Sequence, residues 1–261
     1  DLILKLNLFL KVQSFFSSLS ILGIAAVMYV CLLILGTLSG KVFHLHGEHL
    51  QLYRAMTVFG NVGFMGIPIV VSIYPEKGML YMAVFTIIDQ LMLWTLGVKL
   101  TSSEKESGTF NPKKLINPVT VAIILAMICV LTGIRIPLVL NTALQKMGAT
   151  ATPLAMIYLG GVFACIDVLS FVKKPDYYGI TLIKMIGFPV LFYILLRLVP
   201  IPADIRMTMA LTSAMPVMSS VVMMANASGS DGDYAMGGIV VTTLCSVLTL
   251  PVVSWIFQAL G

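Results

Sequence analysis

The sequence predicts an all-α, polytopic membrane protein, on the basis of its composition, its apolar segments and two interrupted helices. Hydrophobic residues make up 59% of the 261 residues and charged residues only 10%, whereas a soluble domain has roughly 25% charged residues. So little charge cannot cover a surface that faces water, and the lipid bilayer is therefore the expected solvent. A transmembrane helix needs about 20 apolar residues, so the length allows roughly eight to ten spans.

Apolar run length and polar punctuation divide the chain into a series of expected spans. Residues 1–10 are too short to cross a membrane and are expected to be the end of a helix. The abrupt junction at Leu10–Lys11 suggests that residues are missing there and before Asp1. The amphipathic stretch 137–147 is expected to lie at the membrane interface. The expected spans are 18–40, 53–74, 79–98, 116–134, 150–171, 178–199, 205–227 and 234–259.

The polar stretch 101–114 is the longest loop and is expected to be a linker that divides the chain. Excess Lys and Arg marks cytoplasmic loops, and a small bias places this linker in the cytoplasm and the C-terminus outside. The richer side carries Lys41, Arg54, Lys99, Lys105, Lys113, Lys114, Lys173 and Lys174. The poorer side carries Lys11, Lys77, Arg135, Lys146, Arg197 and Arg206. The net charge of +5 does not indicate nucleic-acid binding, since no basic run is interleaved with aromatic residues on a soluble element.

The two halves of the chain are expected to be related. Each contains a long apolar helix, a span interrupted by proline, a short loop and another span, and the two prolines, Pro68 and Pro216, are 148 residues apart. If five spans form one repeat, an odd number, the second copy must be inverted in the membrane. We expect one domain overall, made of a first inverted repeat at 1–100 that is incomplete at its N-terminus, the linker 101–114, and a second inverted repeat at 115–261.

The stretch FGNVGFMGIPIV, residues 59–70, places three glycines and a proline inside an expected span. Pro68 lacks a backbone donor, and the glycines lower the cost of leaving helical geometry. In lipid, freed backbone groups are tolerated only where they are buried in protein or face a water-filled cavity. A second interruption surrounds Pro216. We expect both helices to be broken within about three residues of these prolines and to cross; for a single such segment, a proline kink at a tight helix crossing is the alternative.

Two broken helices that cross bring the N-termini of two half-helices to one point. Each N-terminus carries about half a positive charge and free N–H groups, so the pair forms an anion site without an arginine. Discontinuous helices at matching places in inverted repeats also mark the central binding site of secondary transporters. The serines Ser213, Ser219 and Ser220 flank Pro216 and are candidates for this site.

The segment GNVGFMGIP, residues 60–68, resembles the Asn-x-Gly-Phe-x-Gly-x-Pro segment of the auxin efflux carrier family. That family includes the plant PIN-type auxin exporters and bacterial malate and malonate permeases. Residues 89–98 look like its next helix, residues 115–128 resemble the start of its second half, residues 153–164 resemble its small-residue span, and residues 213–253 match its closing pattern throughout. The resemblance covers about residues 18–261.

The resemblance implies a fold of ten spans in two inverted five-helix repeats, with the fourth and ninth spans broken and crossed. It also implies a secondary transporter, an efflux carrier or permease, that moves small organic anions such as carboxylates or auxin-like acids by alternating access. The expected partners are this anion, the lipid bilayer of the plasma or inner membrane, H⁺ or Na⁺ as coupling ion, and a second copy of the chain in a homodimer. The substrate-binding residues would be Asn61, Gly66, Pro68, Asp89, Gln90, Ser213, Pro216 and Ser219.

Asp89 is a departure from the plant exporters, which tend to carry uncharged residues at this place, so indole acetate itself is not the expected substrate. An ionisable residue inside a membrane is a functional candidate by default. Asp89 is surrounded in sequence by large apolar residues and is poorly solvated; it is a candidate proton carrier, cation ligand or wall of the site. The alternative is a structural partner of Lys184 or of backbone amides. Lys184 itself could extend to the interface.

Other functions are less consistent with these residues. A sodium-coupled bile-acid-type symporter shares the crossed-helix architecture, but its Na⁺ site would need clustered Asn, Gln and Glu at both crossings, and the second half offers serines. A membrane sensor that binds a ligand without moving it is the alternative outside transport. No GxGxxG, P-loop or nucleophile motif is present, and Asp89 has no paired Gly-x-Gly-Asp segment, so neither an enzyme nor a cofactor is expected.

The histidines of KVFHLHGEHL do not indicate a metal site, because this hydrophilic loop lacks a second cluster of ligands; they are His44, His46 and His49. Three oxygen-bearing side chains follow the second broken helix and are expected to cap helices, with a bound cation as the alternative. They are Asn226, Asp231 and Asp233.

Overall fold

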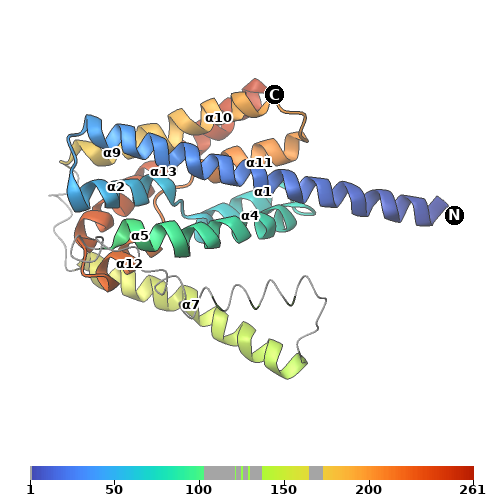
Figure 1. The fold of residues 1–261 in the computed structure, drawn as a ribbon, viewed down its shortest axis with the longest axis horizontal. Coiled ribbons are helices and arrows are strands. Elements are labelled where there is room, and N and C mark those ends of the chain that lie inside the picture. The colour runs from blue at the N-terminus through green and yellow to red at the C-terminus, as the bar shows by residue number, and fades with distance from the viewer. Residues whose placement is uncertain (1, 103–120, 122–124, 126–128, 130–136, 165–172) are drawn as a thin grey trace.

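The computed structural model describes residues 2–102, 121, 125, 129, 137–164 and 173–261. Within these residues every regular element is a helix (Figure 1), which confirms the all-α prediction. The expected linker 101–114 after Ser102, the expected span 116–134 apart from three positions, and the end of the expected span 150–171 lie outside the described residues.

The helices follow the apolar segments of the sequence, with short π-helical stretches, labelled η, inside several of them. In chain order the elements are α1 (Leu2–Val42), α2 (Gly47–Val58), η1 (Val62–Gly66), α3 (Ile67–Ile73), α4 (Gly78–Met92), η2 (Leu93–Gly97), α5 (Val98–Thr101), α7 (Leu138–Ala164), α9 (Pro175–Leu182), η4 (Ile183–Gly187), α10 (Phe188–Leu196), α11 (Ala203–Ser213), α12 (Ser220–Ala227) and α13 (Gly232–Leu260).

Four stretches of the described helices are long and apolar enough to cross a membrane. They are Leu19–Val42, Gly78–Thr101, Pro175–Leu196 and Gly232–Leu260. Each corresponds to one of the spans expected from the sequence. The molecule is therefore an integral, multi-pass membrane protein.

Two expected boundaries are wrong. Residues 1–10 are not a separate helix end, since α1 runs without interruption from Leu2 to Val42, through the junction at Leu10–Lys11. The stretch 137–147 is not a separate element, because residues 138–147 are the first part of α7; its position at the membrane interface stays a prediction. Polar side chains alone do not end a helix, and a single glycine such as Gly148 costs only about 1 kcal/mol there.

The two interrupted helices cross, as predicted. The first consists of α2, a break at residues 59–61, and then η1 and α3; the second consists of α11, a break at residues 214–219, and α12. The breaks pair through an antiparallel bridge between Gly60 and Val217. The Asn61 N–H donates to the Pro216 carbonyl at 2.7 Å, and the Met218 N–H donates to the Phe59 carbonyl at 3.1 Å.

The predicted position of the break is correct for Pro216 and wrong for Pro68. Pro68 lies in the first turn of α3, directly after the π-helical η1, and the chain leaves helical geometry seven to nine positions earlier, at residues 59–61. Proline fits the first turn of a helix, where its missing N–H is not needed. At Gly60 the second broken helix comes so close that an added Cβ would lie 3.1 Å from the Met215 Cβ.

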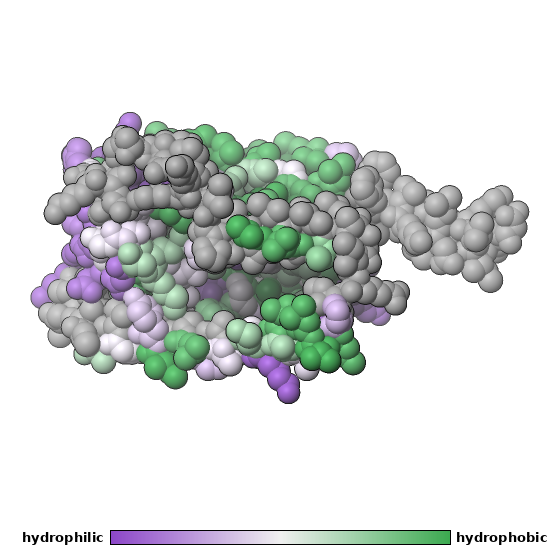
Figure 2. All heavy atoms as spheres, turned by 60° about the horizontal axis from the view of Figure 1, so that its bottom comes forward, coloured by the Kyte–Doolittle hydropathy of each residue, from purple (hydrophilic) through white to green (hydrophobic). Residues whose placement is uncertain are grey.

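Helices α1, α2 and α4 pack together, as do α10 with α11 and α13 with α9 and α12. Figure 1 shows α7 running along one side of this bundle, and the first half of α7 is exposed on nearly all its sides, with Val139, for example, 84% exposed. Hydrophilic residues gather mainly at the end where α2 and α9 begin, and hydrophobic residues are more frequent toward the other end of the face in view (Figure 2). We call this end the α9 end, and the opposite one, where α10 ends and α11 begins, the α10 end.

Candidate functional site

The crossing brings together four ends of half-helices. The C-terminal ends of α2 and α11 and the N-terminal ends of η1 and α12 all meet at the paired breaks. The N-terminal ends carry positive partial charge and the C-terminal ends carry negative partial charge. The residues around the crossing therefore decide which of these ends remains available to a ligand.

Asn61 closes the N-terminal end of η1. Its side-chain oxygen accepts a hydrogen bond from the Phe64 N–H at 3.4 Å, while its backbone N–H is used in the bridge to Pro216. The side chain is half-buried. Asn61 therefore lies at the crossing, as predicted from the sequence, with its amide at the start of a half-helix.

Lys184 neutralises the C-terminal end of α2. Its ammonium donates to the carbonyl oxygens of Met56 at 2.7 Å and Phe59 at 2.6 Å. These carbonyls belong to the last turn of α2 and to the break, where helical partners are missing. The side chain is 1% exposed, so it does not extend to the interface, contrary to one expectation from the sequence.

Asp89 lies in a polar group next to Lys184. It is 2% exposed, its Oδ1 accepts a hydrogen bond from the Tyr29 hydroxyl, and its Oδ2 accepts one from Gln90 Nε2 at 3.2 Å. Trp94 Nε1 in turn donates to Gln90 Oε1 at 3.3 Å. Asp89 and Lys184 attract each other electrostatically, but they form no direct ion pair.

Tyr29 is a residue that the sequence analysis missed. It is 2% exposed, and its hydroxyl donates a hydrogen bond to Asp89. The centroid of its ring lies 6.0 Å from that of Phe59, at the first break, and 6.2 Å from that of Phe85. The only signal in the sequence is a phenol in the middle of a long apolar helix, where a buried hydroxyl needs a partner.

The second break is supported by a threonine that the sequence analysis did not single out. The Val217 N–H donates to Thr242 Oγ1 at 3.1 Å, so α13 supports the break. The Ser213 hydroxyl donates within its own helix, to the Ala210 carbonyl at 2.7 Å. Ser219 is buried at the start of α12 and makes no capping hydrogen bond with its side chain.

The structure gathers some of the predicted site residues and separates others. Asn61 and Pro216 meet directly, and Gly66 faces Met215, whose Cγ lies 3.5 Å from where a Cβ would be. Asp89 is hydrogen-bonded to Tyr29, whose ring lies near Phe59 at the first break, and Gln90 is hydrogen-bonded to Asp89. Pro68 is exposed, further along the first broken helix.

Comparison with known sequences agrees with this geometry. Residues 4–254 match the family described as membrane transport protein. The chain belongs to this family, that of the auxin efflux carriers. It is also similar to an uncharacterized transporter, MJ1031, of Methanocaldococcus jannaschii, with 25% identity over 271 residues that cover 96% of this chain and 84% of the relative. Family members are transporters rather than enzymes.

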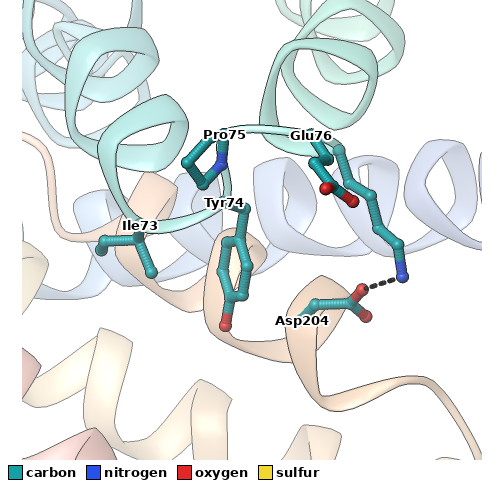
Figure 3. Close-up of a pocket in the computed structure, with 6 residues that line it drawn as sticks. Ile73, Tyr74, Pro75, Glu76 and Asp204 are labelled. Atoms are coloured by element: carbon teal, nitrogen blue, oxygen red, sulfur yellow. Dashed lines mark hydrogen bonds and ion pairs between the residues drawn. The ribbon is translucent and has the colours of Figure 1, made fainter.

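This transporter also has a cavity of about 450 Å³ at the α10 end. Figure 3 shows the residues around it, which come from the α3–α4 turn and the start of α11: Ile73, Tyr74, Pro75, Glu76, Lys77 and Asp204. Asp204 accepts hydrogen bonds from Lys77 Nζ at 3.2 Å and from the Tyr81 hydroxyl at 2.8 Å. Burial alone would raise the pKa of Asp204, but these hydrogen bonds outweigh burial and hold the pKa below its usual value. The cavity does not lie at the crossing.

The described parts of the chain contain no group of three or more His, Cys, Asp or Glu residues that could hold a metal ion. Of the side chains that follow the second broken helix, Asp231 caps α13, since its Oδ1 accepts the Tyr234 N–H at 2.9 Å. Asn226 instead donates to the Tyr158 hydroxyl at 2.8 Å, which joins α12 to α7.

Proposed function

We propose that this transporter carries small organic anions, carboxylates in particular, and binds them at the crossing of its two broken helices. The observation that carries the proposal is the meeting of two half-helix N-termini, those of η1 and α12, at the paired breaks. Such ends offer N–H groups and positive partial charge to an anion. Asn61, at the start of η1, adds an amide that can donate to a carboxylate.

Lys184 and Asp89 support an anion as the substrate, because together they offset the negative partial charge at the C-terminal end of α2. Lys184 satisfies the carbonyl end of α2, which would otherwise repel an anion, and Asp89 balances the ammonium. Of the four ends at the crossing, the two N-terminal ends then face only one negative end without a cation, that of α11. The proposed binding set is Asn61, Gly66, Pro216 and Ser219, with Asp89, Gln90 and Ser213 as supporting residues and Pro68 beyond the site.

Movement of the anion requires that the crossing open alternately to the two sides. We propose that the chain consists of two inverted repeats, at 1–100 and 115–261, and that the crossed helices move as a unit against scaffold helices that include α7. The matched breaks and the exposed face of α7 support this division.

We also propose a homodimer formed through the scaffold, with a dimeric mass in mild detergents and in nanodiscs as its test.

Transport into proteoliposomes tests the proposal. Purified protein is reconstituted with an internal unlabelled carboxylate, and exchange with labelled dicarboxylates and aromatic carboxylates outside is measured, with neutral analogues as controls. We expect exchange of at least one carboxylate and none of its neutral analogue. Binding without exchange for every carboxylate would make the protein a sensor, and strict dependence on Na⁺ would indicate Na⁺ rather than H⁺ as the coupling ion.

A further inference from the structure

Gly63 is a glycine that neither packing nor backbone conformation explains. At Gly60 an added Cβ would lie 3.1 Å from the Met215 Cβ, and at Gly66 it would lie 3.3 Å from Val62 Cγ1. At Gly63 no atom of the described residues lies within 4 Å of that position, and Gly63 is not among the residues with positive φ. Glycine inside a helix is destabilising relative to alanine. The contacts of Gly63 within the chain give no compensation for this.

The N–H of Gly63 has no hydrogen-bond partner among the described residues. Every other N–H from Asn61 to Gly66 donates to an oxygen: Asn61 to Pro216, Val62 to Gly60, Phe64 to the Asn61 side chain, and Met65 and Gly66 to the Asn61 carbonyl. Backbone donors without a partner are rare where they are buried. Gly63 is exposed, so its N–H is able to take a partner from outside the chain.

The other half-helix that starts at the crossing also has a free donor. The Ser219 side chain is only 4% exposed, yet its hydroxyl makes no capping hydrogen bond and has no other partner in the described part of the chain. Hydroxyls buried to this degree usually have a partner. Ser219 follows Val217, which pairs with Gly60 in the bridge between the two breaks. Free donors therefore occur on both half-helices.

We propose that Gly63 is a substrate-binding residue, whose backbone N–H donates to a carboxylate oxygen of the substrate and whose missing side chain lets that oxygen come within about 3 Å. This inference rests on the proposed function and adds a residue to the same site. Glycine is the residue that allows a ligand to approach the backbone closely. The helix that begins here extends from Val62 to Ile73, and the positive partial charge of its N-terminal end favours the same oxygen.

Asn61 supplies a second donor beside Gly63. Its side-chain oxygen is used by the Phe64 N–H, which leaves its NH₂ group to donate. A carboxylate has two oxygens, each of which accepts, and hydrogen bonds to an ionised acceptor are stronger than those to a neutral one. A neutral amide has a single acceptor oxygen. The pair of donors therefore favours carboxylates over their amides.

Ligand-dependent thermal unfolding of the purified protein tests the role of Gly63. Succinate and benzoate are the first carboxylate probes, with succinamide and benzamide as neutral controls. Gly63→Leu keeps the N–H and favours helix, so the unfolding midpoint without ligand should not fall. Its side chain covers the N–H, so the Kd of the carboxylate should rise roughly ten-fold or more, as expected for the loss of a hydrogen bond to a charged group. Gly63→Ala, with a smaller side chain, should raise the Kd less.

Gly148→Leu is the matched control. Gly148 is exposed in α7, and no atom of the described residues lies within 4 Å of its added Cβ, so this change should leave the Kd unaltered. If Gly63→Leu binds the carboxylate as tightly as the unmodified protein, the role of Gly63 is overturned while the proposed function stands. If Gly63→Leu has a lowered midpoint without ligand, Gly63→Ala decides, and an unchanged Kd there overturns the role. If the unmodified protein binds no carboxylate, the proposed function fails and this inference fails with it.

Discussion

Lys184 places a charged ammonium where water does not reach, and such a charge is tolerated only when its donors are satisfied. Two carbonyls at the end of α2 accept from it, and Asp89 supplies an opposite charge nearby. A lysine in the middle of an apolar span is therefore fixed by the break in a different helix. Its environment could not be deduced from its own neighbours in sequence.

Replacement of Lys184 by methionine should destabilise the protein strongly. The change keeps a flexible apolar stem but leaves two buried carbonyls without their donor, which costs roughly 1–3 kcal/mol for each buried group left unsatisfied, and it also removes the nearby counter-charge of Asp89. Thermal unfolding of purified protein in detergent measures the effect. Lys99→Met, on an exposed side chain of α5, is the control and should shift the unfolding midpoint little. Equal shifts in both variants would contradict the role assigned to Lys184.

Asp89 accepts hydrogen bonds on both carboxylate oxygens, which is the arrangement of an ionised group. We therefore expect Asp89→Asn to lower stability, because Lys184 loses its counter-charge and the new amide cannot accept from both Tyr29 and Gln90. The competing role, that of a proton carrier, gives a different result: the amide would imitate the neutral acid, anion binding would survive, and its pH dependence would flatten. Anion binding from about pH 5 to 8, measured with unfolding midpoints in both proteins, separates the two roles.

At the scale of the element, the glycines and the proline of the first broken helix have different roles, which their presence in the sequence alone did not reveal. The sequence correctly indicated that residues 59–70 are interrupted, because three glycines and a proline are unusual inside a span. It did not show which of them marks the break. Pro68 fits the first turn of α3, whereas Gly60 permits the close approach of Met215, and that approach depends on a partner helix more than 150 positions away.

Two alanine substitutions in the first broken helix should separate these roles. At Gly60 an added Cβ would lie 3.1 Å from the Met215 Cβ and 3.4 Å from its carbonyl oxygen, whereas at Gly63 nothing lies within 4 Å. We expect Gly60→Ala to cost about 1–3 kcal/mol through overpacking, and Gly63→Ala to be neutral or slightly stabilising, since alanine favours helix. Unfolding midpoints of the two variants give the comparison. If the Gly60→Ala protein is as stable as the Gly63→Ala protein, the close approach of Met215 does not require glycine at position 60.

At the scale of the whole molecule, the length of the apolar runs predicted the helices well, because lipid requires every backbone group to be satisfied within a helix. The matched interruptions around Pro68 and Pro216 predicted that two broken helices cross, because freed backbone groups in lipid must be buried in protein or face a cavity. The sequence did not predict Tyr29 as the partner of Asp89, or Thr242 as the support of the second break, because these contacts join helices that are distant in the chain. The inverted repeats stay a prediction.

The orientation of the molecule is the last expectation open to a direct test. At the α9 end the described residues include Lys41, Lys99, Lys173 and Lys174; at the α10 end they include Lys77, Arg197 and Arg206. From this small excess we expect the α9 end to face the cytoplasm.

Cysteines introduced one at a time in place of His46, at the α9 end, and Glu76, at the α10 end, report the orientation, because both positions are exposed. Intact cells that carry each variant are treated with a membrane-impermeant maleimide. We expect Glu76→Cys to be labelled at once and His46→Cys only after permeabilisation. The parent protein with its native cysteines is the control for background labelling. The reverse pattern would mean that the α10 end, rather than the α9 end, faces the cytoplasm.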